Sequence, residues 1–307
     1  MNFIPAQRTE NSAYIQLLIL ASYVLAGLIA GTILSFAVLF GMYGMEIFNN
    51  PLALAGDDSH YISGLKAAQV ITTVFMFLLP PVLLAITERT KITVFYGFKK
   101  PKLFIILIVF MIMACSLPLM EWLSAANQKM VLPEFLKTVE NWMREKEDAA
   151  MKMTVLLLTI NNVWDFLINI GMIALLPAIS EELLFRGGVQ RSFQKMFNNP
   201  HVAIWLSAFI FSAIHMQFFG FFPRMILGAA FGYIYLWTGS LWYAMLAHFL
   251  NNAYAVCVAW YLQLHHIPLS EADNSTNFKW YGYLISLILT IFLFQYLKKK
   301  TNGNQLD

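Results

Sequence analysis

Two adjacent glutamates and an arginine follow a long apolar run, in the stretch SEELLFR that begins at Ser180. Glu182 and Arg186 are four residues apart, so they can pair on one face of a helix. Glu181 is left without an obvious local partner. Pro177 limits the preceding helix, and Ser180 could cap a new one whose first turn holds both glutamates, where the helix dipole favours negative charge. Taken alone, the stretch fits a capped helix as well as a chemical site.

Two histidines and two asparagines stand in apolar stretches further along the chain. FSAIHMQFF contains His215, and YAMLAHFLNNAY contains His248, Asn251 and Asn252. Ionisable side chains inside a bilayer are costly and usually face the interior of a helix bundle or an aqueous cavity. His248 and Asn252 are four residues apart and share one helix face, which Asn251 could also approach. We expect these groups to form one polar site with Glu181.

These residue types fit the hydrolysis of a peptide bond. A carboxylate that reaches water can act as a general base, and a histidine can hold the same water or return a proton. A second histidine and an amide can donate hydrogen bonds to a developing oxyanion. A covalent route has less support, because no GxSxG stretch occurs and neither Ser180 nor Ser212 has an evident partner base.

The composition is that of an integral membrane protein. The chain has 307 residues, of which 59% are hydrophobic and 12% charged, against about 25% charged residues in an ordinary soluble domain. Near-continuous apolar segments with short polar joints predict one polytopic membrane domain over residues 1–307. The run from Tyr14 to about Phe40 is longer than the core of a signal peptide, so we expect a retained transmembrane helix. Cys115 and Cys257 lie in separate apolar runs and imply neither a disulfide nor a cysteine metal site.

We expect an all-α bundle of about eight transmembrane helices around an internal polar cavity. The predicted spans lie near residues 14–42, 66–87, 103–123, 154–177, 202–221, 222–240, 241–262 and 279–297. The core that bears the motifs covers about 154–262. Apolar residues recur at helical spacing within 129–152, which predicts an amphipathic helix outside the membrane. Residues 301–307 form a polar tail.

The basic residues predict the orientation, because lysine and arginine concentrate in cytoplasmic loops. The connection after the first span carries Asp57 and Asp58 and no basic residue before Lys66, so we place it outside. The basic residues that predict the topology fall on the opposite side. Arg8 precedes the first span, and Arg89, Lys91, Lys99, Lys100 and Lys102 follow the second. Arg186, Arg191 and Lys195 follow the fourth span, and Lys298, Lys299 and Lys300 follow the eighth. Both termini are therefore expected in the cytoplasm, with the bundle in a bacterial cytoplasmic membrane.

Three short motifs give the chain a resemblance to a known family. EELLFR fits EExxxR, FSAIH fits FxxxH and HFLNN fits HxxxN, in that order. The sequence thereby resembles the CPBP family of intramembrane proteases, which includes endopeptidases of prenylated CAAX proteins and bacterial members, called Abi-type, linked to bacteriocin processing or self-immunity. The resemblance implies that Glu181 and His215 activate the attacking water. It also implies that His248 and Asn252 stabilise the oxyanion.

The same resemblance implies a supporting role for Glu182 and Arg186 and leaves metal dependence open. Glu181, His215 and His248 are a plausible zinc set with an open position for water. However, no HExxH stretch occurs and the three groups come from separate helices. We favour a mechanism without tightly bound zinc.

The expected substrate is a membrane-associated peptide or protein, which need not be prenylated. The alternative is a non-catalytic immunity or scaffold protein that binds a partner through the same polar core. A transporter is less favoured, because the sequence shows no inverted repeat. A net charge of only +3 gives little support to nucleic-acid binding. Two GxxxG pairs, Gly27 with Gly31 and Gly228 with Gly232, are assigned to internal helix packing. The sequence does not indicate the oligomeric state.

Overall fold

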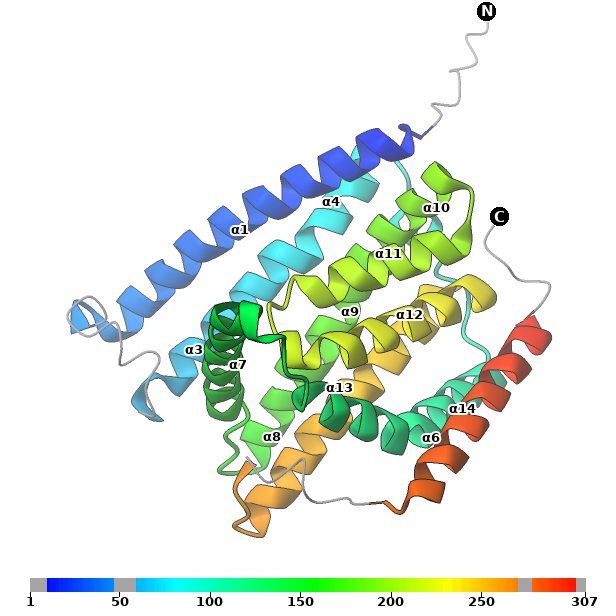
Figure 1. Ribbon diagram of the computed structural model, residues 1–307. Coiled ribbons are helices and arrows are strands. Elements are labelled where there is room, and N and C mark those ends of the chain that lie inside the picture. The colour runs from blue at the N-terminus through cyan, green and yellow to red at the C-terminus, as the bar shows by residue number, and fades with distance from the viewer. Residues whose placement is uncertain (1–9, 47–58, 270–277, 302–307) are drawn as a thin grey trace, which may run out of the picture.

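The computed structural model describes residues 10–46, 59–269 and 278–301. These residues fold into helices without a strand (Figure 1). Helices are expected here, because backbone N–H and C=O groups inside a bilayer must find their partners within the segment. The prediction of an all-α membrane bundle is therefore confirmed. Arg8, Asp57, Asp58 and the tail residues 302–307, which entered the sequence predictions, lie outside the described residues.

The helices follow one another along the chain with short connections. The main ones are α1 (Ala13–Tyr43), α3 (Ile62–Thr73), α4 (Leu79–Thr87), α6 (Leu103–Gln128), α7 (Lys137–Leu157), α8 (Val163–Asn169), α9 (Leu176–Glu182), α10 (Arg191–Phe197), α11 (Pro200–Ala213), α12 (Phe221–Thr238), α13 (Leu241–Leu264) and α14 (Trp280–Thr301). Short helical turns are η2 (Ser59–Tyr61), α5 (Ile92–Phe95), η4 (Glu134–Leu136) and η7 (Phe218–Gly220). Three π-helical segments join longer helices: η3 (Val74–Leu78), η5 (Ile170–Leu175) and η6 (Leu183–Gln190).

Six segments of the described chain are long and apolar enough to cross a membrane. They are Ala13–Tyr43, Ile62–Thr87, Leu103–Gln128, Val163–Phe197, Phe218–Thr238 and Trp280–Thr301. Two of the eight predicted spans are not among them. α11 has only 14 residues, whereas α13 has 24 residues but carries His248, Asn251 and Asn252. The membrane assignment therefore holds, and the number of eight crossings is not established.

One continuous helical path over residues 163–197 carries both glutamates. The prediction that Ser180 starts a new helix after Pro177 is wrong. Pro177 lies in the first turn of α9, directly after the π-helical segment η5, where a residue without an N–H is tolerated. The Ser180 Oγ donates to the Leu176 carbonyl at 2.7 Å instead of capping a helix. Both glutamates consequently lie inside a helix and not at its N-terminus.

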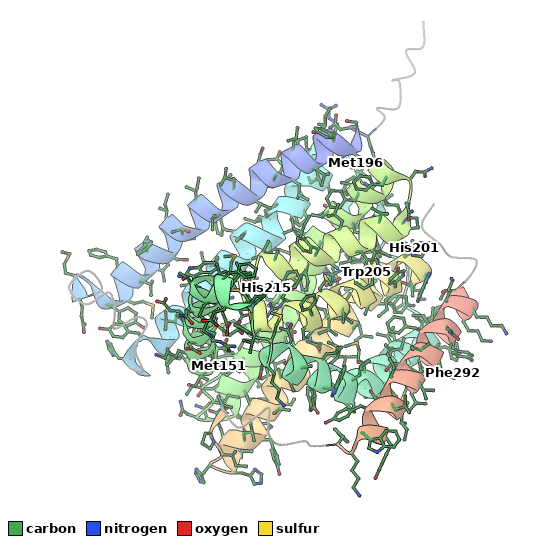
Figure 2. The ribbon with its side chains drawn as sticks, viewed as in Figure 1. Met151, Met196, His201, Trp205, His215 and Phe292 are labelled. Atoms are coloured by element: carbon green, nitrogen blue, oxygen red, sulfur yellow. The ribbon has the colours of Figure 1, made fainter. Side chains whose placement is uncertain are left out.

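His215 lies just beyond the end of α11. The helix covers Pro200–Ala213, and Met216 has a left-handed backbone with φ 54°, which a right-handed helix does not accommodate. The predicted span over 202–221 is therefore corrected to a shorter helix followed by a turn that leads through η7 into α12. Figure 2 shows His215 at the end of α11 opposite to His201.

The segment between α6 and α8 contains a helix that starts later than the predicted range 129–152. α7 spans Lys137–Leu157 and follows the turn η4. Its Trp142 ring packs against the Phe218 ring, with centroids 5.4 Å apart. α7 therefore rests on η7, the turn that follows His215, and lies in front of the bundle in Figure 1.

Both GxxxG pairs face other helices of the same chain. A Cβ atom at Gly27 would lie 2.0 Å from the Phe75 carbonyl oxygen of η3. A Cβ atom at Gly232 would lie 2.6 Å from the Gln190 Oε1 of η6. The interpretation that these glycines serve close packing inside the protein is confirmed.

The N-terminal end of α1 is fastened to α10 by ion pairs. Glu10 accepts hydrogen bonds from the Arg191 Nη2 at 2.8 and 2.9 Å and also pairs with Lys195. Burial raises the pKa of the Glu10 carboxyl, and the bonds to the two cations outweigh this effect and lower the pKa to about 2.

Candidate active site

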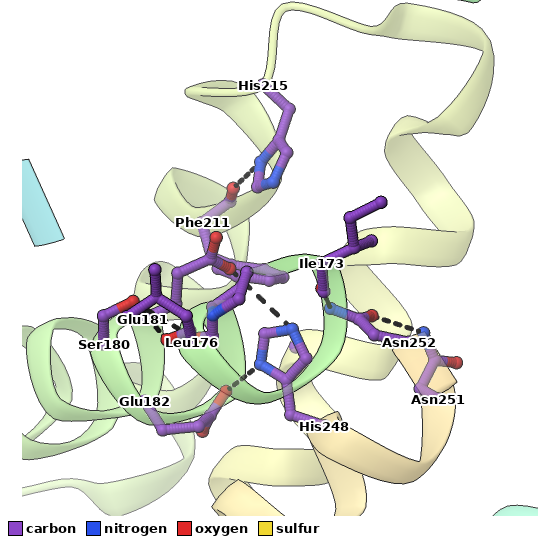
Figure 3. A network of polar contacts seen from close by, with 12 residues as sticks. Ile173, Leu176, Ser180, Glu181, Glu182, Phe211, His215, His248, Asn251 and Asn252 are labelled. Carbon is purple, nitrogen blue, oxygen red and sulfur yellow. Dashed lines mark hydrogen bonds and ion pairs between the residues drawn. The ribbon is translucent and has the colours of Figure 1, made fainter. Parts of the chain in front are cut away.

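Glu182, Arg186 and His248 form a buried charge network. The Arg186 Nη1 donates to the Glu182 Oε1 at 2.8 Å, as the four-residue spacing predicts. The His248 Nδ1 lies 2.8 Å from the same oxygen (Figure 3). The Arg186 Nη2 donates to the Gly228 carbonyl at 2.8 Å. Because the Glu182 and Arg186 side chains are 0% and 1% exposed, removing either one would leave a buried charge without its partner.

Two phenylalanine rings enclose this network. The Phe231 ring stacks on the His248 imidazole with centroids 5.2 Å apart, and the Arg186 guanidinium lies 4.7 Å from the centre of the Phe211 ring. Apolar walls keep water out and so strengthen the electrostatic interactions inside. Phe211 is the first residue of the FSAIH motif, so the sequence held a signal for it. Phe231 stands in an apolar helix and gave none.

Glu181 is the carboxylate that this network leaves free. Its Oε2 lies 3.8 Å from the His248 Nε2, and its side chain is 13% exposed (Figure 3). Among the contacts of the described residues, no hydrogen bond engages Glu181. A carboxylate that has no donor of its own and lies beside a histidine can accept a proton from an entering water molecule.

His215 presents its Nε2 atom as a hydrogen-bond acceptor. Its Nδ1 lies 2.8 Å from the Phe211 carbonyl oxygen. A carbonyl oxygen only accepts, so Nδ1 carries the hydrogen and the neutral ring keeps a lone pair on Nε2. No hydrogen bond or ion pair joins the described side chains of His215 and Glu181. Both lie within electrostatic range of His248, and Figure 3 shows His215 above the pair that Glu181 and His248 form.

Asn252 supports the helix that carries Glu181. Its Nδ2 donates to the Ile173 carbonyl at 3.1 Å (Figure 3). Ile173 lies four residues before Pro177, which has no N–H to donate as an α-helical residue would, and the asparagine amide supplies this carbonyl with a donor. The Asn251 Nδ2 donates in turn to the Asn252 Oδ1 at 3.2 Å. Asn252 therefore contacts the helix directly, and Asn251 acts through Asn252.

The two serines considered as nucleophiles have other partners. The Ser212 Oγ donates to the Phe221 carbonyl at 2.7 Å, and the Ser180 Oγ donates to backbone carbonyls of its own helix. Neither hydroxyl bonds a histidine among the described residues. The site therefore offers carboxylates and imidazoles to water and no activated serine.

The residues considered as zinc ligands do not form a ligand set in this arrangement. No three histidine, cysteine, aspartate or glutamate side chains of the described chain gather closely enough to hold one ion. The Nδ1 atoms of His215 and His248 are bonded to Phe211 and Glu182, respectively, an arrangement that metal-bound and metal-free histidines share. The mechanism that these side chains support therefore uses only groups of the chain itself.

An apolar groove lies beside the site. It has a volume of about 650 Å³ and is lined by α1, η3, η6, α10 and α11. Phe185 and Ile214 belong to its wall, and Phe185 packs against Phe211, with ring centroids 5.2 Å apart. Ile214 directly precedes His215. The groove thus gives an apolar chain a place next to the polar residues.

The part of the chain that carries the three motifs is similar to known proteins. Residues 163–254 match the family model described as type II CAAX prenyl endopeptidase Rce1-like. A protein of Bacillus subtilis (strain 168), named "Uncharacterized protein YpbD", is 33% identical over 110 residues, which are 34% of this chain and 52% of that protein. The match therefore spans about half of the relative's length. No solved structure matches the chain. The matched range contains EELLFR, FSAIH and HFLNN, the three motifs that carry the resemblance to the CPBP family, and the two matches support that resemblance over this part of the chain.

Proposed function

We propose that the protein is an intramembrane endopeptidase that hydrolyses a peptide bond of a membrane-associated peptide or protein. The observation that carries this proposal is the pair of Glu181 and His248. Glu181 has no hydrogen-bond donor among the described residues and lies 3.8 Å from an imidazole. A second, fully buried carboxylate, Glu182, holds that imidazole in place from its other nitrogen. Paired carboxylates with unlike surroundings are suited to different roles in proton transfer.

In this mechanism Glu181 and His215 activate water. The water oxygen forms a bond to the carbonyl carbon of the substrate while its proton moves to the Glu181 carboxylate, and the Nε2 lone pair of His215 holds the water by accepting its second hydrogen. The electron pair of the carbonyl moves onto its oxygen. The carbon–nitrogen bond then breaks, and the proton on Glu181 passes to the leaving nitrogen.

His248 and Asn252 are assigned to the oxyanion side of the reaction. Glu182 keeps the His248 ring oriented through its Nδ1, and a hydrogen on the Nε2 is the donor that the oxyanion would meet. The Asn252 Nδ2 has two hydrogens, of which one serves the Ile173 carbonyl. Arg186 neutralises Glu182 and so supports the site without contacting the substrate.

The apolar groove supports a substrate that lies in or on the membrane. Its wall combines α1 with η6 and α11, the elements that flank Glu181 and His215. A hydrophobic or lipidated part of the substrate would bury apolar area in the groove and bring the adjoining peptide bond to the site. Prenylation is one such modification, and the chemistry does not require it. The distribution of basic residues further supports a cytoplasmic-membrane location with both termini in the cytoplasm.

The decisive experiment compares wild-type protein with Glu181→Ala and Glu181→Gln in lipid vesicles that contain candidate membrane peptides. Glu145→Ala is the matched control, because Glu145 is an exposed glutamate of α7. We expect cleavage by the wild type and the control, and a loss on the order of 10²–10⁴-fold in both Glu181 variants. Equal cleavage by all four proteins would remove Glu181 as the base. A biological effect that survives both Glu181→Ala and His215→Ala would instead support the scaffold alternative.

Metal dependence is tested on the same preparations. We favour hydrolysis without tightly bound zinc, so chelator treatment should leave cleavage unchanged, and the purified protein should carry less than one zinc per chain. Stoichiometric zinc whose removal abolishes cleavage would overturn this preference.

A further inference from the structure

Arg224 is a second arginine at the site that belongs to none of the three motifs. It lies in the first turn of α12, after the turn η7 that follows His215. Its Nη2 donates to the Gln217 Oε1 at 2.6 Å. The guanidinium packs closely over Gly220, where a Cβ atom would lie 3.2 Å from the Nη2. Gln217 and Gly220 thereby hold the guanidinium in a defined place.

The other end of this guanidinium lacks a partner. The Arg224 Nη1 is buried and makes no hydrogen bond with the described residues. Leaving a charged donor buried without an acceptor is costly, so the acceptor has to come from outside the chain, as a water molecule or a ligand. Arg224 lies within electrostatic range of Glu181 and His215, so that ligand would be at the reacting groups.

Each of the other donors of the site already has at least one partner within the protein. Arg186 donates one nitrogen to Glu182 and the other to the Gly228 carbonyl. The Asn252 Nδ2 donates to the Ile173 carbonyl. His248 has its Nδ1 on Glu182, and its Nε2 carries a hydrogen only in one tautomer or in the charged form. Among these groups Arg224 is the cation that is permanently charged and still has free N–H groups.

We propose that Arg224 donates a hydrogen bond from its Nη1 to the substrate carbonyl oxygen as that oxygen becomes an oxyanion. The inference rests on the proposed peptidase function and adds a catalytic residue to it. When water attacks, the carbonyl electron pair moves onto the oxygen, and the guanidinium stabilises the new charge without itself losing a proton. A fixed cation in a site shielded from water stabilises such charge strongly, because the protein need not reorganise around it.

Glu147 of α7 is the counter-ion that balances Arg224 before the substrate binds. It lies within electrostatic range of Arg224 and accepts a hydrogen bond from the Phe219 N–H at 3.3 Å. It therefore sits on the turn between Gln217 and Arg224. The charge of the guanidinium is balanced from outside the site, while the Nη1 stays free for the substrate.

The test measures kcat and KM separately for Arg224→Gln and Arg224→Lys on a peptide that the wild type cleaves. Arg144→Gln is the matched control, because the Arg144 guanidinium packs on the Phe219 ring of the same turn, 4.5 Å from its centre. We expect Arg224→Gln to lower kcat by about 10²–10³-fold with little change in KM. Arg224→Lys should retain part of kcat, since it keeps the charge but not the forked geometry. The control should keep kcat within a few-fold.

If no cleaved peptide is found, the affinity of the protein for a peptide analogue tests the role of Arg224 instead. The probe is a hydrophobic peptide phosphinate, whose tetrahedral anion imitates the intermediate, compared with the same peptide carrying an ordinary amide. Arg224→Gln should weaken phosphinate binding by about 10²-fold or more and leave amide binding nearly unchanged. Equal phosphinate binding by Arg224→Gln and wild type, or an effect on KM alone, would overturn the proposal. Cleavage of the peptide by Glu181→Gln at the wild-type rate would count against the peptidase function itself and not against Arg224 in particular.

Discussion

The bond between Asn252 and the Ile173 carbonyl leads to a prediction that a double-mutant cycle can test. Asn252→Ala removes the donor that serves this carbonyl. Pro177 cannot supply another donor, because it has no N–H. Pro177→Ala introduces an N–H four residues after Ile173, where a regular helix places the donor. The asparagine amide should therefore matter for stability in the wild-type background and matter little when Pro177 is replaced.

The magnitude follows from the burial and geometry of the bond. An unsatisfied buried carbonyl costs about 1–3 kcal/mol in soluble proteins, whereas side-chain hydrogen bonds between membrane helices average about 0.6 kcal/mol with a maximum near 1.7. Asn252 is half-buried and its bond is 3.1 Å long. We expect Asn252→Ala to lower the free energy of unfolding by about 1 kcal/mol in the wild type and by less than half of that in Pro177→Ala.

The assay is reversible unfolding in mixed detergent micelles, followed by loss of helicity, for the four proteins of the cycle. Asn251→Ala is the control, because the Asn251 amide bonds the neighbouring side chain and not the Ile173 carbonyl. An equal loss from Asn252→Ala in both backgrounds would refute the idea that Asn252 replaces a helical donor. Cleavage measured on the same proteins separates the two roles of Asn252. A catalytic loss should persist in both backgrounds, and a purely structural one should be relieved by Pro177→Ala.

Three further predictions concern packing and charge. Gly27→Ala should destabilise the fold by about 1–3 kcal/mol, since its Cβ would meet a backbone carbonyl at 2.0 Å. Gly41→Ala in the same helix is the control and should change little, because nothing lies within 4 Å of its Cβ position. Thermal unfolding of both variants checks this prediction. The wild type should lose stability as pH falls through about 2, because the pKa of Glu10 is lowered from an unfolded value of about 4.3. Ionised Glu10 stabilises the fold in full only above its pKa in the unfolded chain, and Glu10→Gln should lack this stabilisation. The free energy of unfolding is measured against pH for both proteins, and identical curves would contradict the prediction. Glu182→Ala should cost about 3–5 kcal/mol by leaving Arg186 buried and unpaired, and an unchanged unfolding midpoint would contradict the buried network.

The structure also explains why two sequence predictions about the site were wrong. Ser180 and Pro177 are typical of a helix start, and the prediction of a new helix followed local rules. The π-helical segment η5 before Pro177 lets the chain continue, and the freed Ile173 carbonyl is satisfied from α13, 79 residues away in sequence. His215 was placed inside a span because the apolar run continues past it. The left-handed Met216 ends the helix there, and hydropathy carries no signal for such a turn.

The sequence by itself determined the class of the protein and the local part of the site. Its apolar runs require helices, because a bilayer offers the backbone no other hydrogen-bond partners. The pair of Glu182 and Arg186 follows from four-residue spacing on one helix. Only the tertiary structure decided that His248 bonds Glu182 across helices, that Asn252 donates to the Ile173 carbonyl and that the Arg224 Nη1 has no partner among the described residues. These contacts depend on how helices far apart in the chain are placed against one another, and spacing along one helix contains no information on that placement.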